Sequence, residues 1–486
     1  DTALVAAGEQ AGLTSSGYSK VDEIPYDFLR RRLTIVVSSP EDPNRHLIIT
    51  KGAFAQVLDI CAEVESHGHK LPLDDPRREE LEAIFRAKGT EGFRALAVAT
   101  REVPARPFHS REDERDLVFR GFLVFHDPPR ADAEQTIAAL ARLGIRIKVI
   151  SGDNRFVTAH MAKAVGLDPQ AMLTGEELAT LKDEALWHLA PRTDLFVEID
   201  PQQKERIVRA LQRTGHAVGF LGDGINDAPA LHSADVGISV EGAADVACES
   251  ADVVLLTPDL GVLRQGVEDG RQTFANTLKY ITITTSANFG NMVSMALATP
   301  LLPFLPLSAK QILLNNVLSD LPSMTISTDR VDPELLSKPQ RWVVGDIRRF
   351  MVVFGLISSV FDLLAFAVLL LGFRASQATF QTSWFLISLL TELAVVLVLR
   401  TRRPFFRSRP SPLLLGSTVV VGLGALAVPF LDGLTAVFGF VPLSPTLMGF
   451  AVLIVGGYIA ATELAKSGFF PREDRDLPRQ PSPTQT

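Results

Sequence analysis

Cysteine is almost absent from the sequence, which contains only Cys61 and Cys248. The two lie far apart and lack metal-site spacing, so we interpret them as buried reduced thiols in a cytosolic environment. The chain also lacks a basic stripe: its net charge of −8 is spread out, which gives nucleic-acid binding no support. We find no signal-peptide pattern, no internal repeat and no low-complexity segment beyond a polar tail after Phe470.

Hydrophobicity is distributed unevenly along the 486 residues. Before about residue 275 charged residues are dense, whereas beyond it apolar runs of membrane-spanning length recur between short polar stretches. The length exceeds one compact domain, and the shift predicts a soluble part followed by a membrane part. The sequence begins at Asp1 in mid-pattern without an initiator Met, so we expect a piece of a longer chain.

The residues up to 116 have the pattern of one α+β unit. Apolar, β-branched runs predict strands at 33–37, 46–50 and 94–99. Helices are expected at 54–66 and 76–90, and the charged stretch 101–117 reads as a connector.

From residue 117 strands and helices alternate, which predicts a parallel, doubly wound α/β sheet. Ligands of such sheets bind at the carboxyl ends of the strands. The expected strands are 118–125, 146–150, 194–197, 217–221, 235–238 and 252–255, and the expected helices are 132–143, 154–165, 176–189, 202–213 and 226–232.

Two of these strand ends carry residues suited to a phosphate and Mg²⁺. One is Ser151-Gly152-Asp153, a weak signal because such a triplet is more often a turn. The other is the run 222–229, Gly-Asp-Gly-Ile-Asn-Asp-Ala-Pro, which is a strong signal. Ser151 and backbone N–H groups could hold phosphate oxygens while Asp223 holds the metal.

The run 222–229 resembles the hinge signature of the P-type ATPases, and the likeness extends over nearly the whole chain. Lys51-Gly52-Ala53 resembles the family's nucleotide-domain motif, and Asp127-Pro-Pro-Arg the entry to its phosphorylation domain. Segments 271–276, 286–291 and 338–342 are most similar to the bacterial magnesium-translocating branch. The resemblance implies a HAD-like doubly wound phosphorylation domain and an α+β nucleotide-binding domain, followed by an α-helical transmembrane bundle.

The resemblance also implies a set of ATP contacts. Tyr26 stands where the family stacks an aromatic residue on adenine. Lys51 and Arg94 stand where cations meet the nucleotide, and Asp127 lies near the ribose and the domain hinge. Glu198 departs from the family, which commonly has Arg there.

Further residues are implied at the phosphate. Ser151, Gly152 and Asp153 match the family's Thr-Gly-Asp, with Ser keeping the hydroxyl, and Lys204 matches its phosphate-contacting lysine. Catalytic Mg²⁺ would be bound by Asp223, with Asn226 and Asp227 supporting that site.

Two parts of the family are missing from the sequence. Asp-Lys-Thr-Gly-Thr, whose Asp is the covalent nucleophile, occurs nowhere, and neither do the actuator domain and the first four helices. Thr174-Gly175-Glu176 is similar to an actuator motif, but we interpret Thr174 as a helix N-cap inside the phosphorylation domain.

Six membrane spans are expected after the soluble part, within 271–466, and their loops predict an orientation. The loops 328–349 and 400–409 are rich in Arg and Lys, so by the positive-inside rule they, both ends and the soluble domains are cytoplasmic.

The domains would be 1–116, nucleotide-binding; 117–270, phosphorylation; 271–466, transmembrane; and 467–486, a polar tail. The spans are 276–298, 306–327, 350–371, 383–400, 412–431 and 446–464.

Polar residues inside these spans are costly and therefore point to a transport site. Pro322 frees a backbone carbonyl one turn earlier. The alternative is that such residues form hydrogen bonds between helices, and for Asp362 the two interpretations are equally supported. Asp432 and Glu463 lie near span ends, where a carboxylate needs no special explanation. The predicted transport residues, which match family positions, are Asn288, Asn291, Asn316, Ser319, Asp320 and Glu392.

The resemblance implies an ATP-driven pump of the bacterial plasma membrane that imports Mg²⁺ through an aspartyl-phosphate, with ATP, the divalent cation and the lipid bilayer as partners. Mg²⁺ as cargo follows from the resemblance, and Ca²⁺ or another cation is the alternative. A catalytically inactive regulatory paralogue would also explain the missing aspartate. A phosphatase fused to a membrane anchor is a further alternative, but an anchor has no reason to align Asn316, Ser319 and Asp320 on one helix face.

Overall fold

The computed structural model describes residues 2–27, 30–38, 42, 44–257 and 259–470. Its contacts divide the chain into two compact units, the first essentially residues up to 262 and the second from 263 onward. An α/β region followed by helices confirms the predicted fold class.

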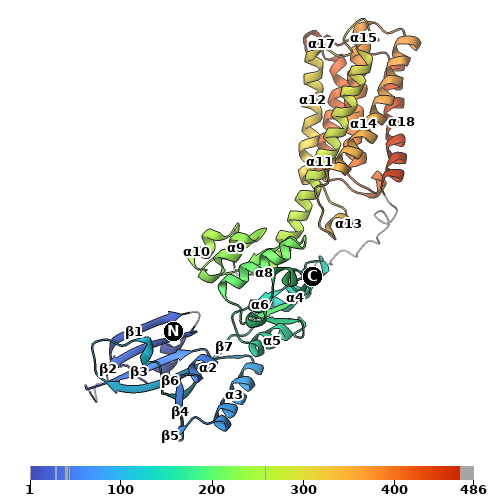
Figure 1. Ribbon diagram of the computed structural model, residues 1–486. Helices are drawn as coiled ribbons and strands as arrows, with labels where there is room; N and C mark the ends of the chain where they lie inside the picture. The colour runs from blue at the N-terminus through green and yellow to red at the C-terminus, as the bar shows by residue number, and fades with distance from the viewer. Residues whose placement is uncertain (1, 28–29, 39–41, 43, 258, 471–486) are drawn as a thin grey trace. The chain divides into compact units, whose positions relative to one another are not determined.

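A seven-stranded sheet begins the first unit (Figure 1), with strand order β1-β2-β3-β6-β7-β4-β5. Neighbouring strands are antiparallel except for the parallel pair β4 and β7. Val36, Ile48, Ala97 and Phe119 are among its buried core residues. The bounds are β1 Ser19–Asp27, β2 Arg32–Ser38, β3 Arg45–Gly52, β4 Cys61–Ser66, β5 His69–Pro72, β6 Phe93–Pro104 and β7 Leu117–His126.

Two local predictions in this region are wrong. The helix expected at 54–66 ends at Leu58, and Cys61–Ser66 forms β4, because pairing with β7 and β5 outweighs the local helical pattern. The strand expected at 118–125 exists as β7, but it pairs with β6 and β4 rather than joining the parallel sheet.

Strand–helix alternation then produces two three-stranded parallel sheets, in the orders β8-β10-β9 and β11-β12-β13. The helix expected at 176–189 is split into α6 and α7, because Leu181 is extended. The strands are β8 Val149–Ile150, β9 Met172–Thr174, β10 Leu195–Val197, β11 Gly219–Leu221, β12 Val236–Val240 and β13 Val253–Leu255.

Short helices accompany these sheets. Thr174 caps α6 through a reciprocal capping box with Glu177, which confirms its interpretation as an N-cap. The helices are α1 Thr2–Gln10, α2 Phe54–Leu58, α3 Asp75–Thr90, α4 Ala133–Arg142, α5 Arg155–Ala164, α6 Gly175–Thr180, α7 Asp183–Leu189, α8 Pro201–Arg213, α9 Ala228–Ser233 and α10 Asp245–Ser250.

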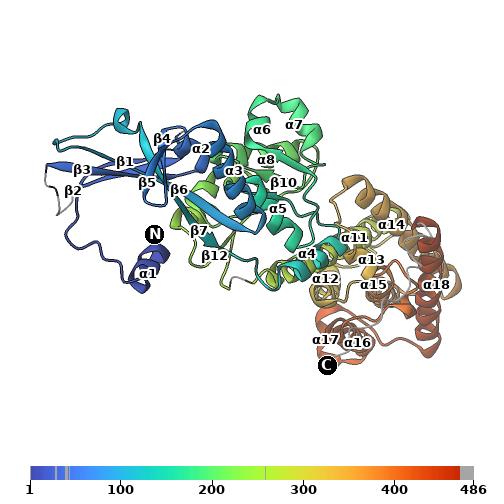
Figure 2. The ribbon, with the colours of Figure 1, turned by 90° about the horizontal axis from the view of Figure 1, so that it is seen from below.

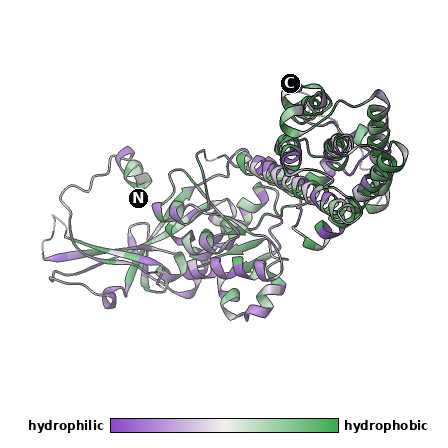
Figure 3. Cartoon of the chain, turned by 90° about the horizontal axis from the view of Figure 1, so that it is seen from above, coloured by the Kyte–Doolittle hydropathy of each residue, from purple (hydrophilic) through white to green (hydrophobic). Residues whose placement is uncertain are grey.

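The second unit is a bundle of helices lying side by side (Figures 1 and 2). Hydrophobic residues predominate along them, whereas the rest of the chain is mixed (Figure 3). The helices are α11 Gly261–Ala298, α12 Ala309–Met324, α13 Pro333–Leu336, α14 Val344–Ala367, α15 Gln377–Leu399, α16 Pro412–Ala427, α17 Asp432–Phe438 and α18 Pro445–Phe469.

Four helical segments of the described chain are long and apolar enough to cross a membrane: Val344–Gly372, Gln377–Leu399, Pro412–Phe430 and Pro445–Phe469. The segments α11 and α12, expected to be the first two spans, do not meet this measure. The helix α12 is short, with 16 residues, and both carry the polar residues of the predicted transport site. The six-span arrangement therefore stays a prediction.

Candidate functional site

Ser151 and Asp153 form a hydrogen-bonded turn directly after β8. Ser151 Oγ donates to Asp153 Oδ2 at 2.9 Å, and the Asp153 amide donates to Ser151 Oγ at 3.1 Å. Gly152 between them is exposed. The turn thus leaves backbone open to solvent at the carboxyl end of a parallel strand, where ligands of such sheets bind.

Arg94 binds Asp153 through two parallel hydrogen bonds. Its Nε lies 2.7 Å from Oδ1 and its Nη2 lies 2.6 Å from Oδ2. The hydrogen bonds that Arg94 donates to the Asp153 carboxylate raise the pKa of Arg94 above its ordinary value. Asp127, which follows β7, lies 3.9 Å from Arg94 Nη1. The predicted nucleotide residues Arg94 and Asp127 are therefore brought to the predicted phosphate turn.

The other two predicted nucleotide residues lie on the seven-stranded sheet. Tyr26 is in β1 and is 50% exposed. Lys51 is in β3 opposite Leu33 and Val98, and these paired positions share one face of the sheet. Glu198 is engaged by Arg155, whose Nη2 lies 3.3 Å from Glu198 Oε2.

The run 222–229 forms a tight turn after β11. Asp227 is buried in it and accepts a hydrogen bond from the Gly224 amide at 3.0 Å and one from Lys204 Nζ at 2.6 Å. Gly222 is needed here, because a Cβ at this position would lie 2.6 Å from the Asp227 Cβ. The turn fixes Asp227 against the first turn of α8.

Asp223 and Asn226 are exposed on the same turn. An exposed carboxylate at a strand end suits Mg²⁺, which keeps several waters and takes one or two carboxylates from a protein. Asp223 therefore fits the predicted metal role, and a bound Mg²⁺ would neutralise phosphate charge there. Both carboxylate oxygens of Asp227 already accept hydrogen bonds, one from Lys204 and one from the Gly224 amide, so Asp227 is suited to positioning the turn.

A cavity of about 150 Å³ lies among α11, α12 and α15. Five of the six predicted transport residues line it, together with Thr284, Ser323 and apolar neighbours: Asn288, Asn316, Ser319, Asp320 and Glu392. Its polar lining residues carry carboxylate, amide and hydroxyl oxygens, which are ligands of hard cations.

Asn291, the sixth, does not line the cavity but contacts Glu392. Its Nδ2 donates to Glu392 Oε1, and Asn315 Nδ2 donates to the same oxygen at 3.2 Å. Asn315 was missed by sequence reasoning, although its neighbour Asn316 was predicted. Two amides from two helices therefore fix one carboxylate oxygen beside the cavity.

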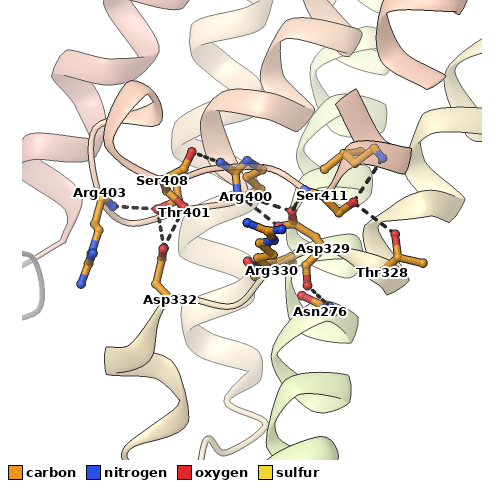
Figure 4. Close-up of polar contacts among 12 residues, drawn as sticks. Asn276, Thr328, Asp329, Arg330, Asp332, Arg400, Thr401, Arg403, Ser408 and Ser411 are labelled. Atoms are coloured by element: carbon orange, nitrogen blue, oxygen red, sulfur yellow. Dashed lines mark hydrogen bonds and ion pairs between the residues drawn. The ribbon is translucent and has the colours of Figure 1, made fainter. Parts of the chain in front are cut away.

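A second polar cluster, also missed, lies at the end of α15 (Figure 4). Asp329 is fully buried and accepts from Lys279 Nζ at 2.8 Å, from Arg400 Nη1 at 3.3 Å and from the Ser411 amide at 3.1 Å. Asp332 accepts from Ser408 Oγ at 2.8 Å. Arg400, counted in sequence as a loop cation, is thus a buried structural group.

Comparisons with known proteins match both ends of the chain. A model of the cation transporting ATPase C-terminus matches residues 304–467, and one of the P-type ATPase cytoplasmic domain N matches residues 1–132. The Magnesium-transporting ATPase, P-type 1, of Escherichia coli K12 is 42% identical over 97% of this chain and 53% of its own length. The protein of that name from Salmonella typhimurium 14028s gives the same identity and coverage.

A Calcium-transporting ATPase of Bacillus subtilis is 30% identical over 93% of this chain and 52% of its own length. The chain spans about half the length of the curated relatives it matches. An α/β region followed by apolar helices agrees with the architecture of the family to which both models belong. The chain belongs to the P-type ATPase family.

Proposed function

We propose that the full-length protein is an ATP-driven pump that imports Mg²⁺ across the bacterial plasma membrane. The observation that carries this is the polar cavity, in which Asp320, Asn316 and Ser319 of α12 meet Asn288 of α11 and Glu392 of α15. Two carboxylates around one polar cavity suit a cation site, since an ionised carboxylate in a membrane is costly without a cation.

ATP would bind through Tyr26, Lys51, Arg94 and Asp127, and its γ-phosphoryl group would pass to an aspartate and then to water. Dividing one hard hydrolysis into two easier steps is the purpose of such a covalent intermediate. Lys204 and Asp223, with Mg²⁺, would offset the phosphate charge. The soluble domains would be cytoplasmic, with α11 and α12 as two further membrane spans.

Mg²⁺ is favoured over Ca²⁺ by the donor set and by the relatives. Mg²⁺ sheds water reluctantly, so carboxylates mixed with amides and retained water suit it, whereas Ca²⁺ takes six to eight oxygen ligands. The relatives named for magnesium are 40–42% identical and the bacterial one named for calcium is 30% identical. Ca²⁺ is the second candidate.

The test is growth of cells that lack Mg²⁺ import and carry the full-length protein. Asp320→Asn keeps the shape and removes the charge, so we expect nearly complete loss of growth rescue and of cation-stimulated ATPase activity, with ATP binding intact. Asp432→Asn, an exposed carboxylate on α17, is the matched control and is expected to behave as the parent. Rescue by Asp320→Asn at parental Mg²⁺ would refute the proposal, and stimulation by Ca²⁺ alone would replace it with a calcium pump.

A further inference from the structure

Asp362 is a buried carboxyl that the proposed transport cavity does not use. It lies on α14 with 4% of its surface exposed. Ser294 Oγ of α11 lies 2.7 Å from its Oδ2, and Trp384 Nε1 of α15 donates to its Oδ1 at 3.0 Å. Ser294 and Trp384 are themselves 0% and 1% exposed. Three helices therefore meet at one carboxyl group.

Small residues bring α11 and α14 together at this point. A Cβ on Gly290 would lie 2.9 Å from the Gly355 carbonyl oxygen, and one on Gly355 would lie 2.9 Å from the Ser286 carbonyl oxygen. Such close approach is typical of small residues at membrane helix contacts. Ser294 lies one turn beyond Gly290, and Asp362 lies two turns beyond Gly355, so the crossing sets their distance.

The number of hydrogen atoms available for hydrogen bonds around Asp362 indicates whether its carboxyl group is protonated. Ser294 Oγ also lies 2.9 Å from the Gly290 carbonyl oxygen, but one hydroxyl has only one hydrogen to donate. Ser359 Oγ lies 3.0 Å and 3.1 Å from the carbonyl oxygens of Gly290 and Gly355. Two hydroxyl hydrogens thus face three acceptors. A hydrogen on Asp362 supplies the third, so that Ser294 can accept from Asp362 and still donate to the Gly290 carbonyl oxygen, while Ser359 donates to one of its two carbonyl neighbours.

The absence of a cation among the described groups that interact with Asp362 also indicates a protonated carboxyl. The groups that interact with Asp362 are Ser294 of α11, Trp384 and Glu392 of α15 and Tyr458 of α18. None of these is a cation, and the ion pairs of the described residues include none to Asp362. An ionised carboxylate would be buried with two neutral donors and a second acid nearby, which is expensive.

We propose that Asp362 is a proton-binding site, in which the carboxylic O–H donates to Ser294 Oγ and Ser294 donates to the Gly290 carbonyl oxygen. Release of this proton to water leaves a buried anion that favours entry of water and separation of α11 from α14. Because Asn291, next to Gly290, holds Glu392, movement of α11 would change the cavity as well. The proton site stands whether or not the cavity transports Mg²⁺.

Infrared spectroscopy of the purified chain in lipid nanodiscs at neutral pH tests the proposal. Only protonated carboxyls absorb in the carbonyl-stretch region of carboxylic acids, and their bands shift in D₂O. We expect Asp362→Asn, which matches the neutral acid in shape, to lose one such band that Glu392→Gln retains. A spectrum in which Asp362→Asn loses no band overturns the proposal.

Two further variants keep the test decisive if Asp362→Asn does not fold. Trp384→Phe removes the donor to Oδ1, and Ser294→Ala removes the acceptor of the acid hydrogen. Both should keep the band and move it to higher frequency, since each weakens one hydrogen bond to the acid. A band unmoved in both variants would mean that it arises elsewhere, and the proposal would fail.

Discussion

Lys204 and Asp227 are joined by an ion pair in which the ammonium nitrogen lies 2.6 Å from one carboxylate oxygen. Both side chains are largely shielded from water, with 16% and 10% of their surface exposed. The pair connects the first turn of α8 to the turn that follows β11. The family resemblance implied that Lys204 contacts phosphate and that Asp227 supports the Mg²⁺ site. The structure shows the two side chains bonded to each other.

Replacing Lys204 should therefore affect stability as well as phosphate chemistry. Lys204→Met leaves the buried Asp227 carboxylate without its charged partner, which costs about 1–3 kcal/mol. We expect a lower denaturation midpoint of the soluble region in urea, followed by circular dichroism. Lys182→Met, at an exposed lysine before α7, is the matched control. Equal midpoints for the two variants would contradict a structural role for the pair.

Asp223→Asn should have the opposite profile. Its carboxylate is exposed, so the substitution should leave the denaturation midpoint within about 0.5 kcal/mol of the parent. In the full-length protein it should abolish phosphoenzyme formation, because the metal loses a charged ligand while the phosphate charge remains. Labelling with radioactive ATP measures this, with Asp245→Asn on α10 as the exposed control. Normal labelling of Asp223→Asn would remove this residue from the metal site.

Acid should destabilise the seven-stranded sheet through Glu114. Burial alone would raise the pKa of this carboxyl, but hydrogen bonds from Arg30, Thr34 and Arg32 outweigh it, so its pKa lies below its ordinary value of 4.5. A group whose pKa is lowered by folding stabilises the fold above its unfolded pKa, and this contribution is lost as pH falls through the folded pKa. Stability should therefore decline below about pH 4.5.

Glu114→Gln tests this linkage. It leaves two arginines without their buried partner, so we expect a loss of about 3 kcal/mol at neutral pH and a weaker dependence of stability on pH below 4.5. Glu112→Gln, at an exposed position two residues earlier, is the control and should retain the parental pH profile. Unfolding by urea between pH 3 and 7 gives both quantities. A parental profile in Glu114→Gln would assign the acid sensitivity to other carboxyls.

Local sequence patterns were sufficient to place a residue where its position depends only on its own segment. Asp153 and Asp223 were placed at strand ends by the run of apolar residues before them. Asn316, Ser319 and Asp320 were placed on one face by helical spacing alone, and the cavity contains all three. Such placements need only the periodicity of one element.

Roles that depend on distant partners could not be predicted in this way. Arg400 was counted only as a cation of the 400–409 loop, because its partner Asp329 lies 71 residues earlier. The strand β4 looked helical because its pairing with β7 is invisible in its own residues. Asn315 was overlooked because helical spacing turns it about 100° from Asn316, and only the folded bundle reveals Glu392 on that side.

Asn315 provides the last prediction. It is 3% exposed, and its Nδ2 shares Glu392 Oε1 with Asn291. Asn315→Leu keeps the volume and removes one of the two donors, so Glu392 should lose orientation without losing charge. In the full-length protein we expect the cation concentration for half-maximal ATPase activity to rise about 10-fold, the scale found for groups that orient a metal ligand. The maximal rate should change less, because Glu392 and Asp320 remain.

Two comparisons separate this orienting role from simple packing. Gln377→Leu changes an exposed amide at the start of α15 and should leave the cation dependence unchanged. Asn315→Asp keeps the size but places a second carboxylate beside Glu392, and like charges in a membrane repel strongly, so it should impair activity more than Asn315→Leu. If Asn315→Leu lowers only the amount of folded protein and the surviving fraction responds to Mg²⁺ as the parent does, Asn315 is a packing residue and does not orient Glu392.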